Sequence, residues 1–147
     1  MNILVMGGTQ FNGLALVHEL ARAGHRVTIL NRGKTEARLP SNIERLICDR
    51  TDLAGLKATL GKRDWDGVYD ISAYRPEDVA TMIEVLEGYT WHYIFASSTV
   101  TYASSNLLPI TENHPLERGE SQNSYGGNKL LCEDLLFEAW RKRGFPM

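Results

Sequence analysis

A glycine-rich turn between an apolar run and an amphipathic segment constrains the fold of this chain most. Residues 3–6 are apolar, Gly7-Gly8-Thr9-Gln10-Phe11-Asn12-Gly13 follows them, and residues 14–23 carry apolar side chains at helical spacing. A buried strand that turns through glycines into a helix is the opening unit of a doubly wound α/β sheet. Gly7 suits the tight turn, and Gly13 suits close packing of the helix against the strand.

The remainder of the chain repeats this alternation of short apolar runs and longer amphipathic segments. Further strands are predicted at residues 26–30, 43–47, 67–71 and 92–96, and further helices at residues 53–60, 76–87 and 124–143. Apolar strands separated by helices predict a parallel sheet with helices on both faces. Right-handed crossovers favour the strand order 3-2-1-4-5. The predicted fold class is therefore α/β, a doubly wound Rossmann sheet of five strands in three α/β/α layers over residues 1–147.

The composition is that of an ordinary globular domain without a strong electrostatic bias. The 147 residues are 43% hydrophobic, and a net charge of -2 argues against a nucleic-acid partner. No stretch approaches the roughly 20 apolar residues that cross a bilayer, and the N-terminus lacks the basic region of a signal peptide. The two cysteines are expected to be reduced thiols, and the four histidines share no ligand spacing. We therefore expect a cytoplasmic chain with no metal and no membrane partner.

The end of the chain is short for this fold. A doubly wound sheet of this type has at least a sixth strand, and residues 145–147 stand where that strand would begin. The fifth strand would then have an unpaired edge, which is a hazard for a folded domain. We therefore expect a truncated chain.

The glycine turn is the predicted site of a dinucleotide pyrophosphate, because the N–H groups and the positive dipole end of a helix point there. Thr9, Gln10 and Phe11 lie in the turn between Gly7 and Gly13 and are expected to contact the phosphates. Gln10 stands where a middle glycine is common, so its side chain would crowd the pyrophosphate or cover it. The alternative is a structural turn with no ligand.

The ends of the next three strands supply the other predicted cofactor contacts. Asn31 stands where NAD sites usually place an acid for the ribose 2′-hydroxyl, and Arg32 and Lys34 follow it. A neutral residue followed by a guanidinium favours NADP over NAD, because a guanidinium suits a 2′-phosphate. A solvated loop charge is the alternative for Arg32. The remaining predicted contacts are Asp49, placed to meet the adenine, its neighbour Arg50, and Ser72 and Ala73 beside a ribose.

Tyr125 and Lys129 are four residues apart in the last predicted helix and therefore share one of its faces. An ammonium this close favours the phenolate form, which a general base acting on an alcohol requires. Ser98 follows the fifth strand, where ligands bind in such sheets, and its hydroxyl is expected to hydrogen-bond the reacting oxygen. The alternative is a structural tyrosine with a surface lysine.

These motifs resemble those of the short-chain dehydrogenase/reductase superfamily, specifically its extended, NAD-dependent epimerase/dehydratase branch. The resemblance covers the segments GGTxFxG, LNRG, CDRTD, FASSTVTYA, ITENHPL and YGGNKLLCE. It implies that Tyr125 is the acid/base, that Lys129 holds the nicotinamide ribose, and that Ser98 is the hydroxyl partner. Thr99 takes that place if the alignment shifts by one residue. The resemblance also implies that substrate specificity comes mainly from a C-terminal domain, which is missing here.

The first two of these segments are also similar to those of an atypical subgroup with chloroplast stem-loop RNA-binding and isoflavone-reductase-like members, which often lack a full catalytic set. Two functions therefore stay open. The first is an NAD(P)-dependent oxidoreductase or epimerase/dehydratase that passes hydride between nicotinamide and an alcohol or carbonyl carbon of a sugar nucleotide or similar small molecule. The retained tyrosine and lysine favour this enzyme, although the isolated fragment is expected to be inactive. The second is a non-catalytic NADP-sensing or RNA-binding module.

The resemblance also implies a possible homodimer, paired through the helix after the fourth strand and the helix that carries Tyr125. The apolar residues that could form this interface equally could face the sheet. They are Met82, Leu86, Leu130 and Leu135.

Overall fold

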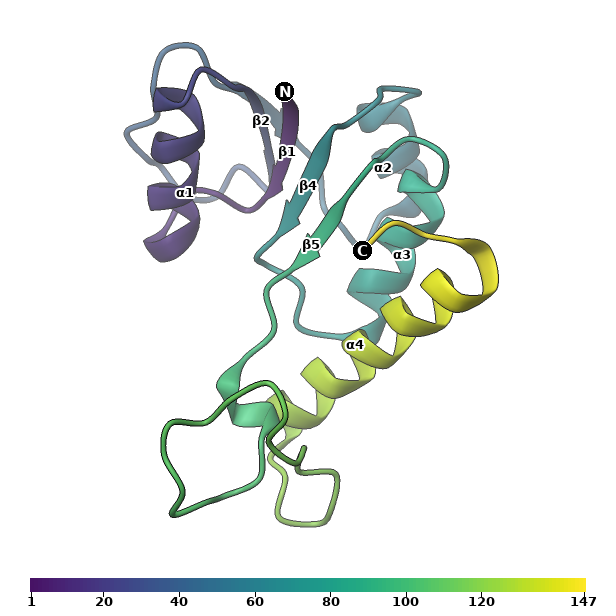
Figure 1. Ribbon diagram of the computed structural model, residues 1–147. Helices are drawn as coiled ribbons and strands as arrows, with labels where there is room; N and C mark the ends of the chain where they lie inside the picture. The colour runs from purple at the N-terminus through teal and green to yellow at the C-terminus, as the bar shows by residue number, and fades with distance from the viewer.

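The computed structural model describes all of residues 1–147 and contains five strands and four α-helices (Figure 1). The strands are β1 (Asn2–Met6), β2 (Arg26–Asn31), β3 (Glu44–Ile47), β4 (Gly67–Asp70) and β5 (Tyr93–Phe95). The α-helices are α1 (Phe11–Arg22), α2 (Leu53–Leu60), α3 (Pro76–Leu86) and α4 (Ser124–Arg143), and a short 3-10 helix, η1, spans Thr99–Thr101.

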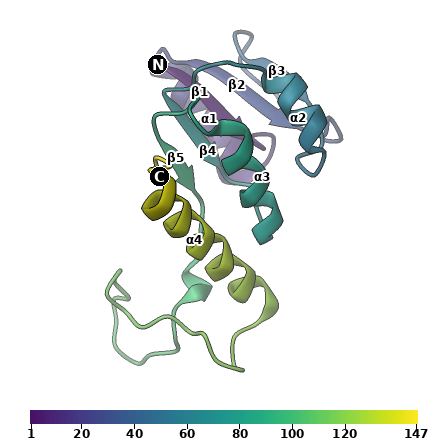
Figure 2. The ribbon, with the colours of Figure 1, turned by 90° about the vertical axis from the view of Figure 1, so that its right-hand side faces the viewer.

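The strands form one parallel sheet in the order β3-β2-β1-β4-β5, which confirms the predicted fold class and topology (Figure 2). The central strands β1 and β2 are apolar and buried along almost their whole length because both faces of the sheet are covered there. All five strands run in the same direction, so their carboxyl ends meet at one edge of the sheet.

The two faces of the sheet are covered unequally. Helices α2, α3 and α4 pack on one face around a cluster of 18 buried residues, while α1 packs on the other around a cluster of five (Figure 1). The difference arises because residues 32–43, which join β2 to β3, contain no helix. Only α1 therefore supplies helical cover on its side.

The helix ends follow from local sequence. Helix α1 begins at Phe11, three residues before the predicted start, because the glycine turn itself leads directly into it. Helix α4 ends at Arg143, after three basic residues in its last turn, and is capped by Gly144, which adopts the left-handed conformation with φ +66°. The short helix η1 lies in the long segment that joins β5 to α4.

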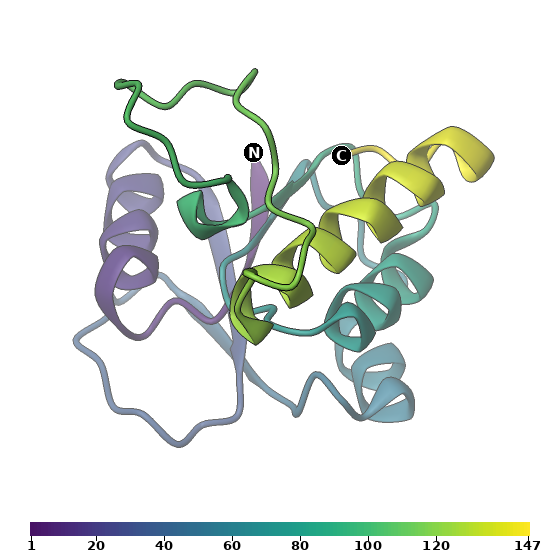
Figure 3. The same cartoon turned by 90° about the horizontal axis from the view of Figure 1, so that it is seen from below.

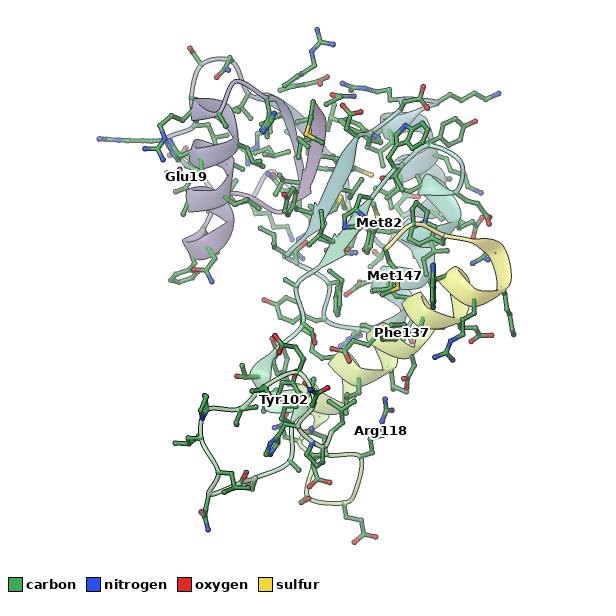
Figure 4. All side chains as sticks on the ribbon, viewed as in Figure 1. Glu19, Met82, Tyr102, Arg118, Phe137 and Met147 are labelled. Carbon is green, nitrogen blue, oxygen red and sulfur yellow. The ribbon has the colours of Figure 1, made fainter.

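Most of the residues of α3 and α4 that were considered for a dimer interface belong to the core. Met82, Leu86 and Leu130 are buried, and Met82 lies between the sheet and the helices (Figure 4). These three side chains therefore face the interior and are unavailable to a partner. The large apolar side chains that α4 exposes are Leu131, Phe137 and Trp140.

The outer edge of β5 carries one hydrogen bond from the last residues of the chain. The backbone N–H of Tyr93 donates to the carbonyl of Pro146 over 2.7 Å, and Phe145 packs against the ring of Tyr93. The remainder of that edge has no partner strand. No helix of the chain is both long and apolar enough to span a bilayer.

Candidate cofactor cleft and catalytic residues

A cleft of about 610 Å³ opens at the carboxyl edge of the sheet, between the glycine turn and the ends of β2, β3 and β4. Figure 3 looks onto this edge from below, with the loop that follows β5 projecting beside it. Most of the predicted cofactor residues line the cleft: Gly7, Thr9, Gln10, Phe11, Gly13, Asn31, Arg32, Asp49, Arg50 and Ser72. Ala73 and Lys129 lie behind its wall and are buried.

The backbone of the glycine turn lies close to neighbouring segments of the chain. Gly7 and Gly8 have φ of +107° and +85°, a region that favours glycine, and the N–H of Gly7 donates to the carbonyl of Leu30. A Cβ on Gly13 would overlap Cδ1 of Ile71 and lie 3.2 Å from Cα of Gly8. The turn therefore brings the backbone of α1 against β1 and β4, and the roles predicted for Gly7 and Gly13 agree with this geometry. Gly8 was not singled out from the sequence.

We expect Gly13→Ala to lower the free energy of unfolding by about 1–3 kcal/mol, as overpacking a close helix–sheet contact does. The added methyl would also push α1 away from the cleft and weaken dinucleotide binding. Urea unfolding and calorimetric titration measure the two effects. Gly127→Ala is the matched control, since a Cβ there meets only Cγ of Gln122 at 3.9 Å. Equal stability of the two variants would contradict the packing role of Gly13.

The N-terminus of α1 is open to an anion. Its N-cap residue, Gln10, makes no side-chain hydrogen bond to the helix, and the first turn contains no acidic residue. The first amides of the helix therefore have no side-chain partner, and they face the cleft together with the positive dipole end. Phe11 is 91% exposed with φ +44°, so its ring projects from the rim and packs against nothing in the domain.

The end of β2 is built around Asn31. Its Oδ1 accepts hydrogen bonds from the N–H of Gly33 over 2.9 Å and from the Arg45 guanidinium over 3.0 Å. Arg45 also donates to the carbonyl of Thr35 over 2.9 Å. The loop after β2 is thereby held to β3, with Arg32 exposed on the cleft. Arg45 was not identified from the sequence, because its position inside a strand gave no sign of it.

Asp49, predicted to meet the adenine, lies exposed after β3. Its Oδ1 accepts hydrogen bonds from the N–H and the hydroxyl of Thr51, and these bonds lower the pKa of the carboxyl. Oδ2 stays free to accept a hydrogen bond from a donor such as an exocyclic amine.

Arg50, predicted to contact the cofactor, forms an ion pair with Asp70 at the end of β4. The guanidinium donates to both carboxylate oxygens of Asp70, over 2.9 and 2.6 Å, and to the Ser72 hydroxyl over 3.1 Å. Burial opposes its charge, but the hydrogen bonds and the charge of Asp70 raise the pKa of Arg50 above its ordinary value. The side chain lines the cleft, yet its donors are directed into the protein.

Asp70 is fully buried and joins several elements of the site. Its carboxylate also accepts from the backbone N–H groups of Ser72 and Ala73 and from the Tyr93 hydroxyl over 2.5 Å. Burial and the charge of Asp70 raise the pKa of Tyr93, so this phenol stays protonated as a donor. Asp70 thus fixes the turn after β4, which carries two predicted cofactor residues.

Lys129 is 3% exposed and bridges the ends of two strands. Its ammonium donates to the carbonyls of Ala73, after β4, and Ala96, after β5, over 2.8 and 2.6 Å. It lies 5.7 Å from the ring centre of Tyr125 and 4.6 Å from that of Phe95. Burial lowers the pKa of this ammonium. The structure therefore brings the predicted tyrosine and lysine together, with the lysine charge directed at backbone oxygens.

Tyr125 stands at the start of α4 and is 41% exposed. The Asn123 side chain caps the helix, and the Gln122 amide donates to the carbonyls of Val100 and Glu117. A Cβ on Gly126 would overlap the Gln122 amide, so a glycine here lets that amide tie η1 to the helix start. Figure 4 shows Tyr102, just after η1, beside this end of α4.

The hydroxyls after β5 are divided between structural roles. The Ser97 hydroxyl bonds Glu133 on α4. The Ser98 hydroxyl accepts from the N–H of Val100 over 3.4 Å, a long bond that caps η1. Thr99 is exposed at the start of η1. Ser98, the first candidate for the hydroxyl partner, is thus only weakly engaged. No group of three or more His, Cys, Asp or Glu side chains is placed to hold a metal ion.

Comparison of the chain with known proteins identifies its family. The sequence model of the NAD dependent epimerase/dehydratase family matches residues 3–147. The chain belongs to this family. The predicted resemblance is thereby confirmed, and the match runs through the glycine turn, the strand ends and the helix that carries Tyr125.

Individual relatives cover the same region. The chain is 35% identical over 147 residues to the chloroplast stem-loop binding protein of 41 kDa b from Arabidopsis thaliana, covering 91% of this chain and 38% of that protein. It is 27% identical to UDP-glucose 4-epimerase from Corynebacterium glutamicum, covering 90% of this chain and 45% of that enzyme. The crystal structure of UDP-glucose 4-epimerase from Brucella ovis in complex with NAD superposes with a TM-score of 0.82 at 25% identity, over 98% of this chain and 49% of that one. The chain therefore spans less than half the length of these proteins.

Proposed function

We propose that this chain is the dinucleotide-binding part of an NAD(P)-dependent oxidoreductase or epimerase/dehydratase that acts on an alcohol or carbonyl carbon of a sugar nucleotide or similar small molecule. One observation carries the proposal. A single cleft joins the uncapped amides of α1 to Ala96, whose carbonyl receives the buried Lys129 ammonium. A phosphate site and a candidate catalytic lysine thus lie at the two ends of one opening.

The residues present suit a dinucleotide. The pyrophosphate would lie against the first amides of α1, where Gly13 allows the close approach of backbone. The adenine would lie toward Asp49, and one ribose beside Ser72 and Ala73. Gln10 and Phe11 would close over the phosphates from the rim.

Three side chains would handle the substrate alcohol. When bound, the nicotinamide supplies or accepts a hydride at the substrate carbon. Tyr125 takes the proton from the substrate hydroxyl or returns it, and Ser98 exchanges its long bond to Val100 for a hydrogen bond to the same oxygen. Lys129 has three N–H donors, and two of them bond backbone carbonyls. The third is available to a ribose hydroxyl.

NADP is the proposed form of the cofactor. Arg32 and Lys34 are exposed and line the cleft beyond the end of β2. No acidic side chain occupies the end of that strand, where an NAD site usually places one.

Cys48 gives a direct test of the cleft. It lines the opening and is partly exposed, whereas Cys132 is fully buried and burial raises the pKa of its thiol to about 11. We expect iodoacetamide to modify Cys48 alone in the folded protein, because the thiolate is the reactive form. Saturating NADP should slow that modification about tenfold or more by covering the thiol. Mass spectrometry of the two cysteine peptides measures both rates.

The glycine turn provides the control for this protection. Gly13→Ala should reduce the protection by NADP, because it weakens dinucleotide binding. The rate without ligand should stay near that of wild type, since Cys48 is already partly exposed. Equal Cys48 modification with and without NADP in the wild-type protein would show that the dinucleotide does not occupy this cleft.

An RNA-binding module is the second candidate, favoured by the 35% identity to a protein named for stem-loop binding. The net charge of -2 weighs against it. Retention of a stem-loop RNA that weakens steeply with salt would support this function, and NADP-independent retention would make it the main one.

A homodimer stays a prediction. Of the residues considered for it, only Leu135 is partly accessible, so an interface on α4 would use the exposed Leu131, Phe137 and Trp140 instead. Sedimentation velocity of the wild-type protein tests the association, with Phe137→Glu expected to abolish it.

A further inference from the structure

The amide of Asn31 has only one chemically consistent orientation. Two donors converge on its Oδ1, the N–H of Gly33 and the guanidinium of Arg45. Neither group can accept a hydrogen bond. The oxygen of the amide must therefore face them, and the nitrogen must face the other way.

The opposite side of this amide is a donor without a partner. Nδ2 of Asn31 is buried and has no hydrogen-bond acceptor within the domain, although Asn31 lines the cleft. Buried amide donors are nearly always paired, so an unpaired one next to an opening indicates a ligand that supplies the acceptor. The end of β2 thus has N–H groups to offer and no free oxygen of the Asn31 side chain.

The positive charges around this amide also favour a ligand that supplies acceptor oxygens. Arg45 contacts the amide directly, and Arg32 and Lys34 line the cleft beside it. The nearby acids are engaged elsewhere: Glu44 pairs with Arg63, and Asp49 accepts from Thr51. The hydrogen bonds from Thr51, and then the charges of Arg32 and Lys34, lower the pKa of Asp49. This single carboxylate can offset only one of the three positive charges of Arg32, Lys34 and Arg45.

We infer that Arg45 is a specificity-determining residue, which turns the Asn31 amide so that β2 ends in donors that recognise the 2′-phosphate of a phosphorylated adenosine. This inference rests on the proposed dinucleotide function and names its adenosine end. An NAD site needs an oxygen here to accept the 2′-hydroxyl proton. On Asn31 that oxygen already accepts hydrogen bonds from Arg45. The Asn31–Arg45 pair therefore disfavours binding of the unphosphorylated ribose and favours binding of the 2′-phosphate.

Asn31→Asp is the sharpest test, because it replaces the unpaired N–H donor by a carboxylate oxygen of nearly the same size and keeps the bonds to Gly33 and Arg45. The probes are adenosine 2′,5′-bisphosphate and 5′-AMP, titrated by calorimetry. We expect the wild-type protein to prefer the bisphosphate by about tenfold or more. Asn31→Asp should reverse that preference, with a thermal melt confirming the fold. An unchanged preference in the variant would overturn the inference.

Arg45→Gln separates orientation from general charge. It should lower the preference for the bisphosphate by about tenfold and leave 5′-AMP binding unchanged or stronger. Arg38→Gln is the matched control, since Arg38 is an exposed arginine of the loop between β2 and β3 that does not line the cleft. An equal loss in both variants would mean that only net charge matters and would overturn the role of Arg45. Equal wild-type affinity for the two probes would overturn the inference alone, whereas binding of neither would also overturn the proposed function.

Discussion

Asp70→Ala is expected to lower the free energy of unfolding by about 3–5 kcal/mol, because it removes the bidentate partner of the largely buried Arg50 guanidinium. Arg50 then keeps only its longer ion pair with Asp78, at 3.5 Å. The change also removes acceptors from Tyr93 and from two backbone N–H groups. Domains of this size are stable by only about 5–15 kcal/mol, so the variant should unfold at a much lower urea concentration. Circular dichroism during urea titration measures the shift.

Two further variants isolate the cause of this loss. Arg50→Met combined with Asp70→Ala removes both charges of this pair and should recover part of the stability, since the buried guanidinium is no longer left without its main partner. Asp78 still accepts hydrogen bonds from the N–H groups of Tyr74 and Arg75. Asp134→Ala breaks the exposed pair with Arg118, whose side chains are about half exposed, and should cost less than about 1 kcal/mol. A loss in Asp70→Ala no larger than that in Asp134→Ala would contradict the structural role of Asp70.

Tyr125→Phe is expected to lower turnover of a sugar nucleotide by about 10²–10⁴-fold, the usual contribution of a positioned proton-transfer group. NADP affinity should stay within about twofold of wild type, since Tyr125 does not line the dinucleotide cleft. The measurement is conversion of UDP-glucose or a related sugar nucleotide by the longest available form of the protein. Calorimetry supplies the affinities.

Tyr69→Phe is the control for this variant, because Tyr69 is a partly buried tyrosine of β4 that packs on the α1 side of the sheet. It should retain full turnover. Undiminished turnover in Tyr125→Phe would remove the tyrosine from the mechanism. No conversion by a wild-type form that spans the full length of the relatives would contradict the proposed substrate class.

The sheet and its order were predictable because each element has a strong local signal. The glycine turn, the apolar runs and the helix-ending glycines are read within a few residues of the chain. The same is true of Tyr125 and Lys129, whose spacing alone places them on one helix face. The cleft follows from the fold, since the ends of parallel strands must meet.

The partners of the site residues were not predictable in the same way. Arg50 follows β3 and Asp70 ends β4, and β2 and β1 stand between these strands in the sheet. Their pairing depends on the path of the loop after β3 and on the start of α3, to which the sequence spacing gives no guide. The same holds for Lys129, whose two carbonyl acceptors come from different strands. The residues of the site were therefore predictable from the sequence, whereas the hydrogen-bond partner of each was not.

The unequal cover of the sheet has a consequence for how a ligand would act. The helix that offers its amides to a phosphate belongs to the smaller of the two apolar clusters, so it should be among the first elements to detach in local opening. A bound pyrophosphate would contact both this helix and the strand ends on the far side of the cleft, and would hold them together. Occupancy would then slow such opening, and the weaker half of the domain would gain most from it.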